Sequence, residues 1–211
     1  MYKYKYSMMI EEKKDCSLFQ IKVTFTLLST QMVKNFMMDE PLIVCVDVDY
    51  RTQGAIAAGV WFRGWQATSA EHEFAVCITE VAEYEPGAFY RRELPCLLRV
   101  LAGGPQPQIV VVDGYVFLEA GVPGLGGHLH AVIGGVVVGV AKTRFASAIA
   151  VPVCRGESSS PLFVTAVGIE ADEAAECVLS MHGQYRLPTL LKRVDRLARE
   201  AYPDYNSYQE D

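Results

Sequence analysis

The sequence has no long apolar run, and this excludes one class of protein. No stretch approaches the roughly 20 consecutive apolar residues that a membrane-spanning helix needs. The segment Met1–Lys14 contains several lysines but no apolar core beside them, so it does not match a secretory signal. We therefore expect no membrane association and an intracellular location, in the cytoplasm or, in a eukaryote, the nucleus.

The sequence also lacks paired cysteines. Its six cysteines are scattered, and none forms a Cys-x-x-Cys pair. Cys45, Cys77 and Cys96 lie inside apolar runs, where cysteine most simply acts as a small buried hydrophobe. The four histidines have no metal-ligand spacing with one another. These absences argue against a structural zinc site and agree with a reducing compartment.

Two nucleotide-binding signatures and an excess of positive charge are missing as well. Gly121–Gly127 is glycine-rich, but it has neither the Gly-Lys-Ser/Thr ending of a phosphate-binding loop nor the spacing of dinucleotide-binding glycines. The formal net charge of −6 and the pI near 5.3 argue against a non-specific nucleic-acid coat protein. A nuclease remains compatible, because metal-binding carboxylates add negative charge and its basic contacts can be local.

What is present is a chain long and apolar enough for one domain: 211 residues, 51% of them hydrophobic. Residues 1–40 show no clear periodicity, and we assign them no role. Beyond them, apolar runs and turn residues predict a regular series of strands and helices. The expected strands are 42–50, 55–62, 71–81, 109–112 and 136–140, with a hairpin over 147–154 and 161–167; the expected helices are 89–101, 170–181 and 188–202.

The order of these elements indicates the fold class. An antiparallel meander is followed by a helix, a buried strand, a glycine-rich loop over 114–127 with a short segment after it, a second buried strand, and then the hairpin and two helices. This is the order of an α/β, ribonuclease H-like fold, with a mixed sheet and helices on both faces. We place this domain at residues 41–205, followed by a tail at 206–211.

Acidic residues stand near the ends of two predicted strands. Asp47 lies near the end of the first strand, and Asp113 directly follows the run Ile109–Val112. In a ribonuclease H-like arrangement these strands are neighbours, so their carboxylates converge at the edge of the sheet where ligands bind. Clustered carboxylates repel one another unless a cation is present, and hard oxygen ligands suit Mg²⁺ or Mn²⁺.

Three more residues complete this set. Glu93 lies near the start of the helix between the two strands, Lys142 follows the strand at 136–140, and Asp195 lies in the last helix. A metal held by carboxylates can activate water and stabilise an in-line phosphoryl transition state. A nearby lysine can offset charge on the phosphate or position the nucleophile. The set therefore predicts metal-dependent phosphoryl chemistry.

Each residue also has an ordinary structural interpretation. Asp47 and Asp113 are residue types that begin turns, and a glutamate in a first helical turn is favoured by the helix dipole. Lysine after a strand is usually solvated. Asp195 has Arg199 four residues later, so a helical ion pair is its default role. We expect Asp49 to face solvent or to support the site indirectly.

Six short segments occur in order along the chain: Val46–Val48, Tyr84–Gly87, Tyr90–Pro95, Val111–Gly114, Gly139–Lys142 and Tyr185–Pro188. In their order and spacing they resemble the endonuclease V family. The resemblance covers about residues 42–201 and implies a metal-dependent endonuclease. Such an enzyme hydrolyses the second phosphodiester bond 3′ to inosine, a deaminated adenine, in DNA and in some members RNA. It uses Mg²⁺, with Mn²⁺ able to substitute, and we expect a monomer.

The resemblance also implies roles for individual residues. Asp47, Glu93, Asp113 and Lys142 would be catalytic, and the metal ligands would be Asp47, Asp113 and Asp195. Glu93 would act on the metal's water and Lys142 near the scissile phosphate. Tyr84 would be a wedge that fills the gap left by a rotated inosine nucleotide. The other substrate-binding residues would be Gly87 and Gly114, which let backbone approach the base, and the pocket walls Phe89, Leu125 and Phe145.

The chain departs from the family pattern in the loop after Asp113. Tyr115, Val116 and Glu119 stand where the family usually has His-Gly and a further histidine, and Glu85 replaces an aliphatic residue in the wedge turn. These changes motivate an alternative, a relative that binds inosine-containing nucleic acid without cutting it. A third hypothesis, an unrelated small-molecule enzyme using the glycine-rich loop, predicts a deep closed pocket rather than an open basic groove.

Overall fold

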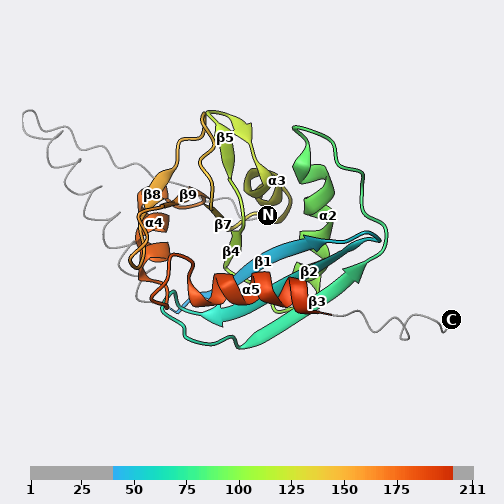
Figure 1. The fold of residues 1–211 in the computed structure, drawn as a ribbon, viewed down its shortest axis with the longest axis horizontal. Coiled ribbons are helices and arrows are strands. Elements are labelled where there is room, and N and C mark those ends of the chain that lie inside the picture. The colour runs from blue at the N-terminus through green and yellow to red at the C-terminus, as the bar shows by residue number, and fades with distance from the viewer. Residues whose placement is uncertain (1–39, 202–211) are drawn as a thin grey trace, which may run out of the picture. The chain divides into compact units, whose positions relative to one another are not determined.

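The computed structural model describes residues 40–201, and the expectations for 1–39 and 202–211 lie outside that range. Its main sheet has seven strands in the order β3-β2-β1-β4-β7-β9-β8, and a separate small sheet pairs β5 with β6 (Figure 1). The strands are β1 Leu42–Tyr50, β2 Ala55–Arg63, β3 His72–Ile78, β4 Ile109–Val112, β5 Phe117–Glu119, β6 Val122–Pro123, β7 Val136–Ala141, β8 Val151–Val153 and β9 Leu162–Val167. The helices are α2 Phe89–Ala102, α3 Leu125–Ile133, α4 Ala171–Ser180 and α5 Thr189–Glu200.

Strand direction makes the sheet mixed. β1 pairs with β4, and β4 with β7, in parallel, whereas β2, β3, β8 and β9 join antiparallel. Parallel neighbours need crossover connections, and these are supplied by α2 between β3 and β4 and by α3 between β4 and β7. This arrangement confirms the expected ribonuclease H-like α/β fold.

The alternating side chains of β1 separate the two faces of the sheet. Val44 and Val46 pack with Leu97 of α2 and Leu129 of α3 in one core cluster. The intervening side chains, such as Ile43, are equally buried against the other face. There α5 lies across β1 and β2, and α4 lies against β8 and β9 (Figure 1). Helices therefore cover both faces, as the sequence predicts.

The element boundaries differ from the expectations mainly around the glycine-rich loop. Helix α3 begins at Leu125, and the preceding stretch contains the short β5–β6 pair instead of an irregular loop. Backbone contacts explain this order, because Gly124 and Gly127 both donate N–H bonds to Val116 O. β3 and the first arm of the hairpin are shorter than expected. Within residues 40–201, no helix has the length and apolar character needed to cross a bilayer.

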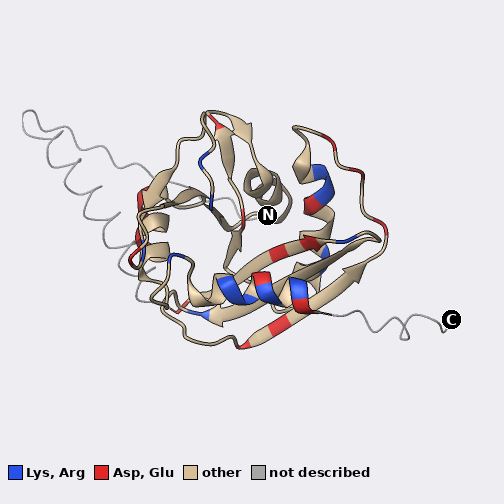
Figure 2. Cartoon of the chain, viewed as in Figure 1, with Lys and Arg blue, Asp and Glu red and all other residues tan. Residues whose placement is uncertain are grey.

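The last helix concentrates positive charge. Helix α5 begins after Pro188, at its predicted start, and buries Leu190, Leu191 and Val194 against the sheet. The rest of α5 carries four basic residues and two acidic ones, so blue residues recur along it in Figure 2. Although the chain is acidic overall, α5 therefore presents cations beside the ends of the central strands.

Candidate active site at the ends of β1 and β4

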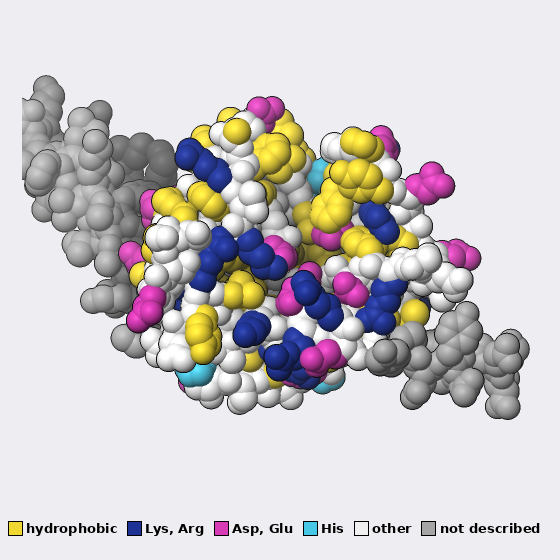
Figure 3. Space-filling view, in the orientation of Figure 1, with side chains coloured by type: hydrophobic (Ala, Val, Ile, Leu, Met, Phe, Trp, Pro, Cys, Tyr) yellow, Lys and Arg dark blue, Asp and Glu magenta, His cyan; other side chains and the backbone are white. Residues whose placement is uncertain are grey.

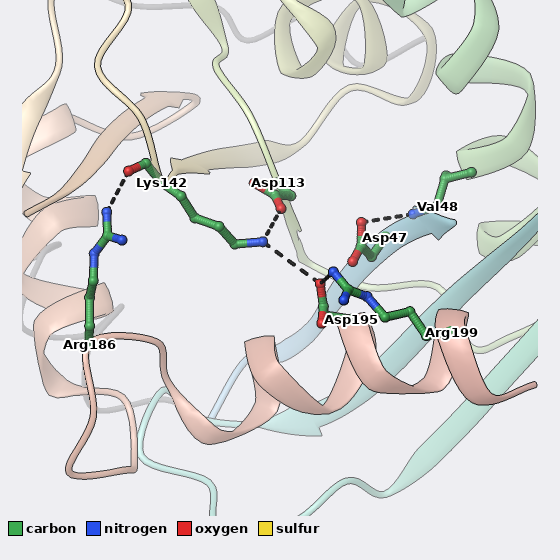
Figure 4. Close-up of polar contacts among 7 residues, drawn as sticks. All are labelled: Asp47, Val48, Asp113, Lys142, Arg186, Asp195 and Arg199. Carbon is green, nitrogen blue, oxygen red and sulfur yellow. Dashed lines mark hydrogen bonds and ion pairs between the residues drawn. The ribbon is translucent and has the colours of Figure 1, made fainter. Parts of the chain in front are cut away.

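The sheet brings Asp47 and Asp113 to one place. Val46 of β1 is paired with Val112 of β4 in the parallel register. The next residue of each strand, Asp47 and Asp113 respectively, therefore comes to the same edge of the sheet. Both aspartates line a cavity of about 380 Å³, together with Glu93. One oxygen of Asp47 accepts a hydrogen bond from Val48 N at 2.9 Å (Figure 4). The predicted convergence of these two carboxylates is therefore present.

Glu93 of α2 adds a third acid to the cavity. Its side chain is buried on α2 at 8% exposure. Burial, followed by the charges of Asp47 and Asp113, raises the pKa of Glu93 to about 8. Burial and the Asp113 charge likewise raise the pKa of Asp47 to about 6, although Val48 N–H and Lys142 act in the opposite direction. The acids are thus close enough to disfavour one another's ionised forms.

Lys142 supplies a positive charge at this cluster. It follows β7, and its Nζ lies 2.6 Å from Asp113 Oδ2 and 3.8 Å from Asp195 Oδ1 (Figure 4). These contacts, with the charge of Asp47, raise the lysine's pKa although desolvation is the largest effect and lowers it. The ammonium therefore stays charged between carboxylates from β4 and α5, where a phosphate oxygen could also reach it.

Asp195 makes the helical ion pair that the sequence suggested and one further contact that it did not. Its Oδ1 lies 3.0 Å from Arg199 Nη2, the expected helical pair, and also faces Lys142. It lines one small cavity with Asp47 and Asp113, so α5 brings it to the acidic cluster (Figure 4). The structural role is confirmed, and a role as metal ligand stays a prediction.

The donor set fits a hard divalent cation. Buried carboxylates with raised pKa values lack sufficient positive charge around them, and carboxylate oxygens are the ligands that Mg²⁺ and Mn²⁺ prefer. Within residues 40–201, however, no group of three or more His, Cys, Asp and Glu side chains is already arranged to hold a metal ion. Lys142 instead lies between Asp113 and Asp195.

Of the residues predicted to bind substrate, Phe89 lines this cavity and Gly114 directly follows Asp113. Tyr84 is 61% exposed in the segment before α2, and Phe89 and Phe145 are also exposed. Gly87 has φ +82° with open space where a Cβ would stand, and Gly114 also borders open space at φ +150°. Leu125 differs: at 8% exposure it packs in the core cluster, so it presents little surface to a ligand.

Tyr115 and Val116, which depart from the family pattern, brace the loops around Lys142. Tyr115 Oη donates to Thr143 O at 2.7 Å and accepts from Phe145 N at 2.9 Å. Val116 is fully buried, and its N–H donates to Thr165 Oγ1 at 2.9 Å. Tyr115 therefore joins the segment after β4 to the segment after β7, and Val116 joins it to β9; neither residue lines the carboxylate cavity.

Two side chains beside Glu93 were not singled out from the sequence. Arg92 Cζ lies 3.7 Å from the centroid of the Tyr50 ring, whose edge also meets Phe89. Tyr50 Oη and Arg92 Nε are buried and have no hydrogen-bond partner within residues 40–201. Arg92 could have been noticed as the neighbour of Glu93, but no local pattern connects Tyr50 to it, because β1 and α2 meet only in the fold.

His128 is a further contact that sequence spacing did not indicate. Its ring stacks on Tyr90 of α2 with 3.5 Å between centroids and 13° between planes. Burial lowers the pKa of this imidazole, which favours its neutral form. The pair joins α3 to the first turn of α2, which also bears Phe89.

A mixed sheet with acids at the carboxyl ends of its central parallel strands, and a lysine among them, defines a ribonuclease H-like protein with a nuclease-type site. The model of the family described as endonuclease V matches residues 27–168. The chain therefore belongs to the endonuclease V family, a family of metal-dependent nucleases.

Individual relatives agree with this assignment. Endonuclease V of Streptomyces coelicolor is 31% identical over 201 residues, which span 80% of this chain and 85% of the relative. The Streptomyces avermitilis protein is 30% identical over 150 residues, spanning 60% of this chain and 66% of the relative. Its crystal structure has a TM-score of 0.64 at 26% identity and covers 84% of this chain and 91% of that chain.

A more distant structure shares the fold. The endonuclease V of Ciona intestinalis, solved with a 23-mer DNA containing an inosine followed by a ribo-adenosine, has a TM-score of 0.64 at 15% identity. The match covers 87% of this chain and 97% of that chain.

Proposed function

We propose that this protein is an inosine-directed endonuclease that hydrolyses the second phosphodiester bond 3′ to inosine in DNA or RNA, using Mg²⁺ or, in its place, Mn²⁺. The single observation that supports this most directly is the meeting of Asp47, Glu93 and Asp113 with Lys142 at one cavity. Membership of the endonuclease V family and the inosine in the Ciona complex support the choice of substrate.

Each residue has a distinct part in this proposal. Asp47 and Asp113, with Asp195 beside them, would hold the divalent cation, which when bound supplies Lewis-acid stabilisation of phosphate charge. Glu93 accepts the proton of the attacking water, for which its carboxylate form is needed. Lys142 donates to an oxygen of the scissile phosphate and offsets its charge.

Recognition of the lesion would take place beside α2. Tyr84 is the exposed aromatic that would fill the stack after the inosine rotates out. The extruded base would lie against backbone at Gly87 and Gly114, between the exposed rings of Phe89 and Phe145, with Leu125 supporting this wall from the core. Glycine is required at Gly87 because its φ is +82°.

The face around the site favours a polymer over a small enclosed substrate. Figure 3 shows it hollowed above α5, with magenta acidic and dark blue basic side chains side by side in the hollow. A cavity of about 940 Å³ continues from the acidic cluster and includes Lys142, Lys192 and Arg199 among its lining residues. This open groove does not resemble the closed pocket that a small-molecule enzyme would need.

The test is cleavage of an end-labelled strand containing one inosine, compared with the same strand containing adenine. We expect a single nick with Mg²⁺ or Mn²⁺ at the inosine strand only. Asp113→Asn should lower the rate by about 100-fold or more, whereas Asp172→Asn on α4 serves as a matched control. Binding without a nick under either metal would instead favour the non-catalytic alternative.

A further inference from the structure

A groove beside the acidic cluster is lined by several cations, of which the proposed chemistry uses only Lys142. Its cavity, of about 940 Å³, shares Lys142, Asp195 and Arg199 with the cavity around Asp47, so the two adjoin. Its charged side chains are four cations and two acids: Lys142, Arg186, Lys192, Arg199, Glu157 and Asp195. On a chain of net charge −6, this local excess of positive charge marks a surface suited to an anionic polymer.

Tyr185 stands in this groove as an exposed aromatic side chain. It is 64% exposed, so it contributes little to covering the core. Lys192 Nζ, from the first turns of α5, lies 5.6 Å from the centroid of its ring. An aromatic face beside an ammonium is the combination with which proteins hold single-stranded nucleic acid, because the ring stacks on a base and the cation meets a phosphate.

The backbone under Tyr185 is held rigidly. Arg155 is a buried cation at 5% exposure, and its guanidinium donates to Tyr185 O at 3.2 Å and Gly183 O at 3.2 Å. It donates further to Met181 O and to Leu179 O. The buried guanidinium therefore donates hydrogen bonds to four carbonyls of the segment 179–185 and holds that segment in place before any ligand binds. A segment that is already ordered loses less entropy on binding.

The same segment is connected to the catalytic lysine. Arg186 Nη2 donates to Lys142 O and, at 2.8 Å, to Pro161 O (Figure 4). The groove wall around Tyr185 and the residue proposed to contact the scissile phosphate therefore form one braced unit. In Figure 1 the segment between α4 and α5 lies on the other side of the acidic ends of β1 and β4 from the segment that precedes α2.

We propose that Tyr185 and Lys192 form a subsite for an unpaired base and its adjacent phosphate, on the side of the cleaved bond away from the inosine pocket. The inference rests on the proposed function, because it assumes that the strand in the groove is the strand being cut. It goes further by requiring that strand to be unpaired at this point, since a base inside a duplex cannot stack on the Tyr185 ring.

The experiment measures binding of a fluorescent single-stranded oligonucleotide without inosine, and of the same oligonucleotide in a duplex, by anisotropy in EDTA. Tyr185→Ala should weaken single-strand binding by about 10-fold or more and duplex binding by no more than about twofold, while Tyr185→Phe keeps both. Lys192→Gln should reduce the slope of log Kd against log salt by about 0.7. Leu179→Ala, at an exposed apolar residue of α4, is the matched control.

The outcomes separate the subsite from the nuclease assignment. Equal weakening of both substrates by Tyr185→Ala, no weakening at all, or no single-strand binding by the unaltered protein would each overturn the subsite, provided that thermal melting shows the variants folded. Cleavage at inosine without this selectivity leaves the endonuclease in place and removes only the subsite. Selective binding without cleavage supports the subsite and overturns the endonuclease.

Discussion

Glu93 is a buried acid whose surroundings favour its protonated form. Burial and the charges of Asp47 and Asp113 oppose its ionisation, and its pKa is about 8. Burial and the charge of Asp113 also raise the pKa of Asp47, to about 6. Without a cation, the repulsion among the carboxylates of Asp47, Glu93 and Asp113 therefore grows as pH rises and more of them ionise. A bound divalent ion would offset this repulsion.

The first prediction concerns this repulsion in metal-free protein. An unfolded glutamate ionises near pH 4.5, so between about pH 4.5 and 8 the folded protein holds a proton that the unfolded chain has released. Stability therefore falls as pH rises through this window, by up to about 1.4 kcal/mol per pH unit for one proton. Thermal melting in EDTA at several pH values should show the fall, and Glu93→Gln should reduce it.

The comparison between the two melting series isolates Glu93, because both proteins share every other titrating group. Parallel curves from pH 5 to pH 8 would show that Glu93 does not hold a proton in the folded, metal-free protein. That result would also contradict its placement next to Asp47 and Asp113.

At the scale of elements, the ends of β4, β7 and β9 fit together very closely. A Cβ at Gly139 of β7 would lie 2.5 Å from Gly114 O and 2.7 Å from Thr165 Oγ1. Thr165 of β9 is 2% exposed and accepts the N–H bond of Val116. The backbone that follows Asp113 is thus packed against β7 and β9, and neither strand carries a proposed catalytic residue.

The second prediction follows from that contact. Thr165→Val keeps the side-chain volume but leaves Val116 N–H buried without an acceptor, at a cost of about 1–3 kcal/mol. For a domain of this size we expect Tm to fall by about 3–10 °C, with reduced cleavage because Asp113 loses its support. Thr165→Ser keeps the hydroxyl, so calorimetry should show a smaller loss. An unchanged Tm in Thr165→Val would refute the bracing role.

For the whole molecule, function depends on uniting acids from distant segments around a cation. Asp113 and Lys142, 29 positions apart, are in direct contact, and α5 brings Asp195 to them from near the end of the described chain. The cationic groove on the α5 side and the exposed aromatics near α2 then flank the same cluster. One strand of nucleic acid could therefore contact both regions during a single cut.

The third prediction concerns metal removal. EDTA should abolish cleavage of the inosine strand, and Mg²⁺ or Mn²⁺ should restore it, because the carboxylates alone cannot stabilise phosphate charge. Added Mg²⁺ should raise Tm more at pH 8 than at pH 5.5, since ligand carboxylates must be ionised to bind the ion. Full cleavage in EDTA, or an equal rise in Tm at both pH values, would contradict the metal site.

The sequence by itself determined the elements and the places of the acids. Side-chain periodicity is a local property, so most strands and helices could be predicted, with Asp113 directly after β4 and Asp47 in the second half of β1. The motif spacing likewise predicted the endonuclease V family, which the comparisons confirm. The expected ion pair of Asp195 with Arg199 is also present, because both lie on one helix.

Only the tertiary structure decided which side chains meet across elements. It buried Leu125 in the core, placed Tyr50 against Arg92, and used Tyr115 to tie two loops together. It also supported Tyr185 on the buried Arg155. Such contacts join residues far apart in the chain, and their geometry follows from sheet order and helix packing, which local patterns do not specify.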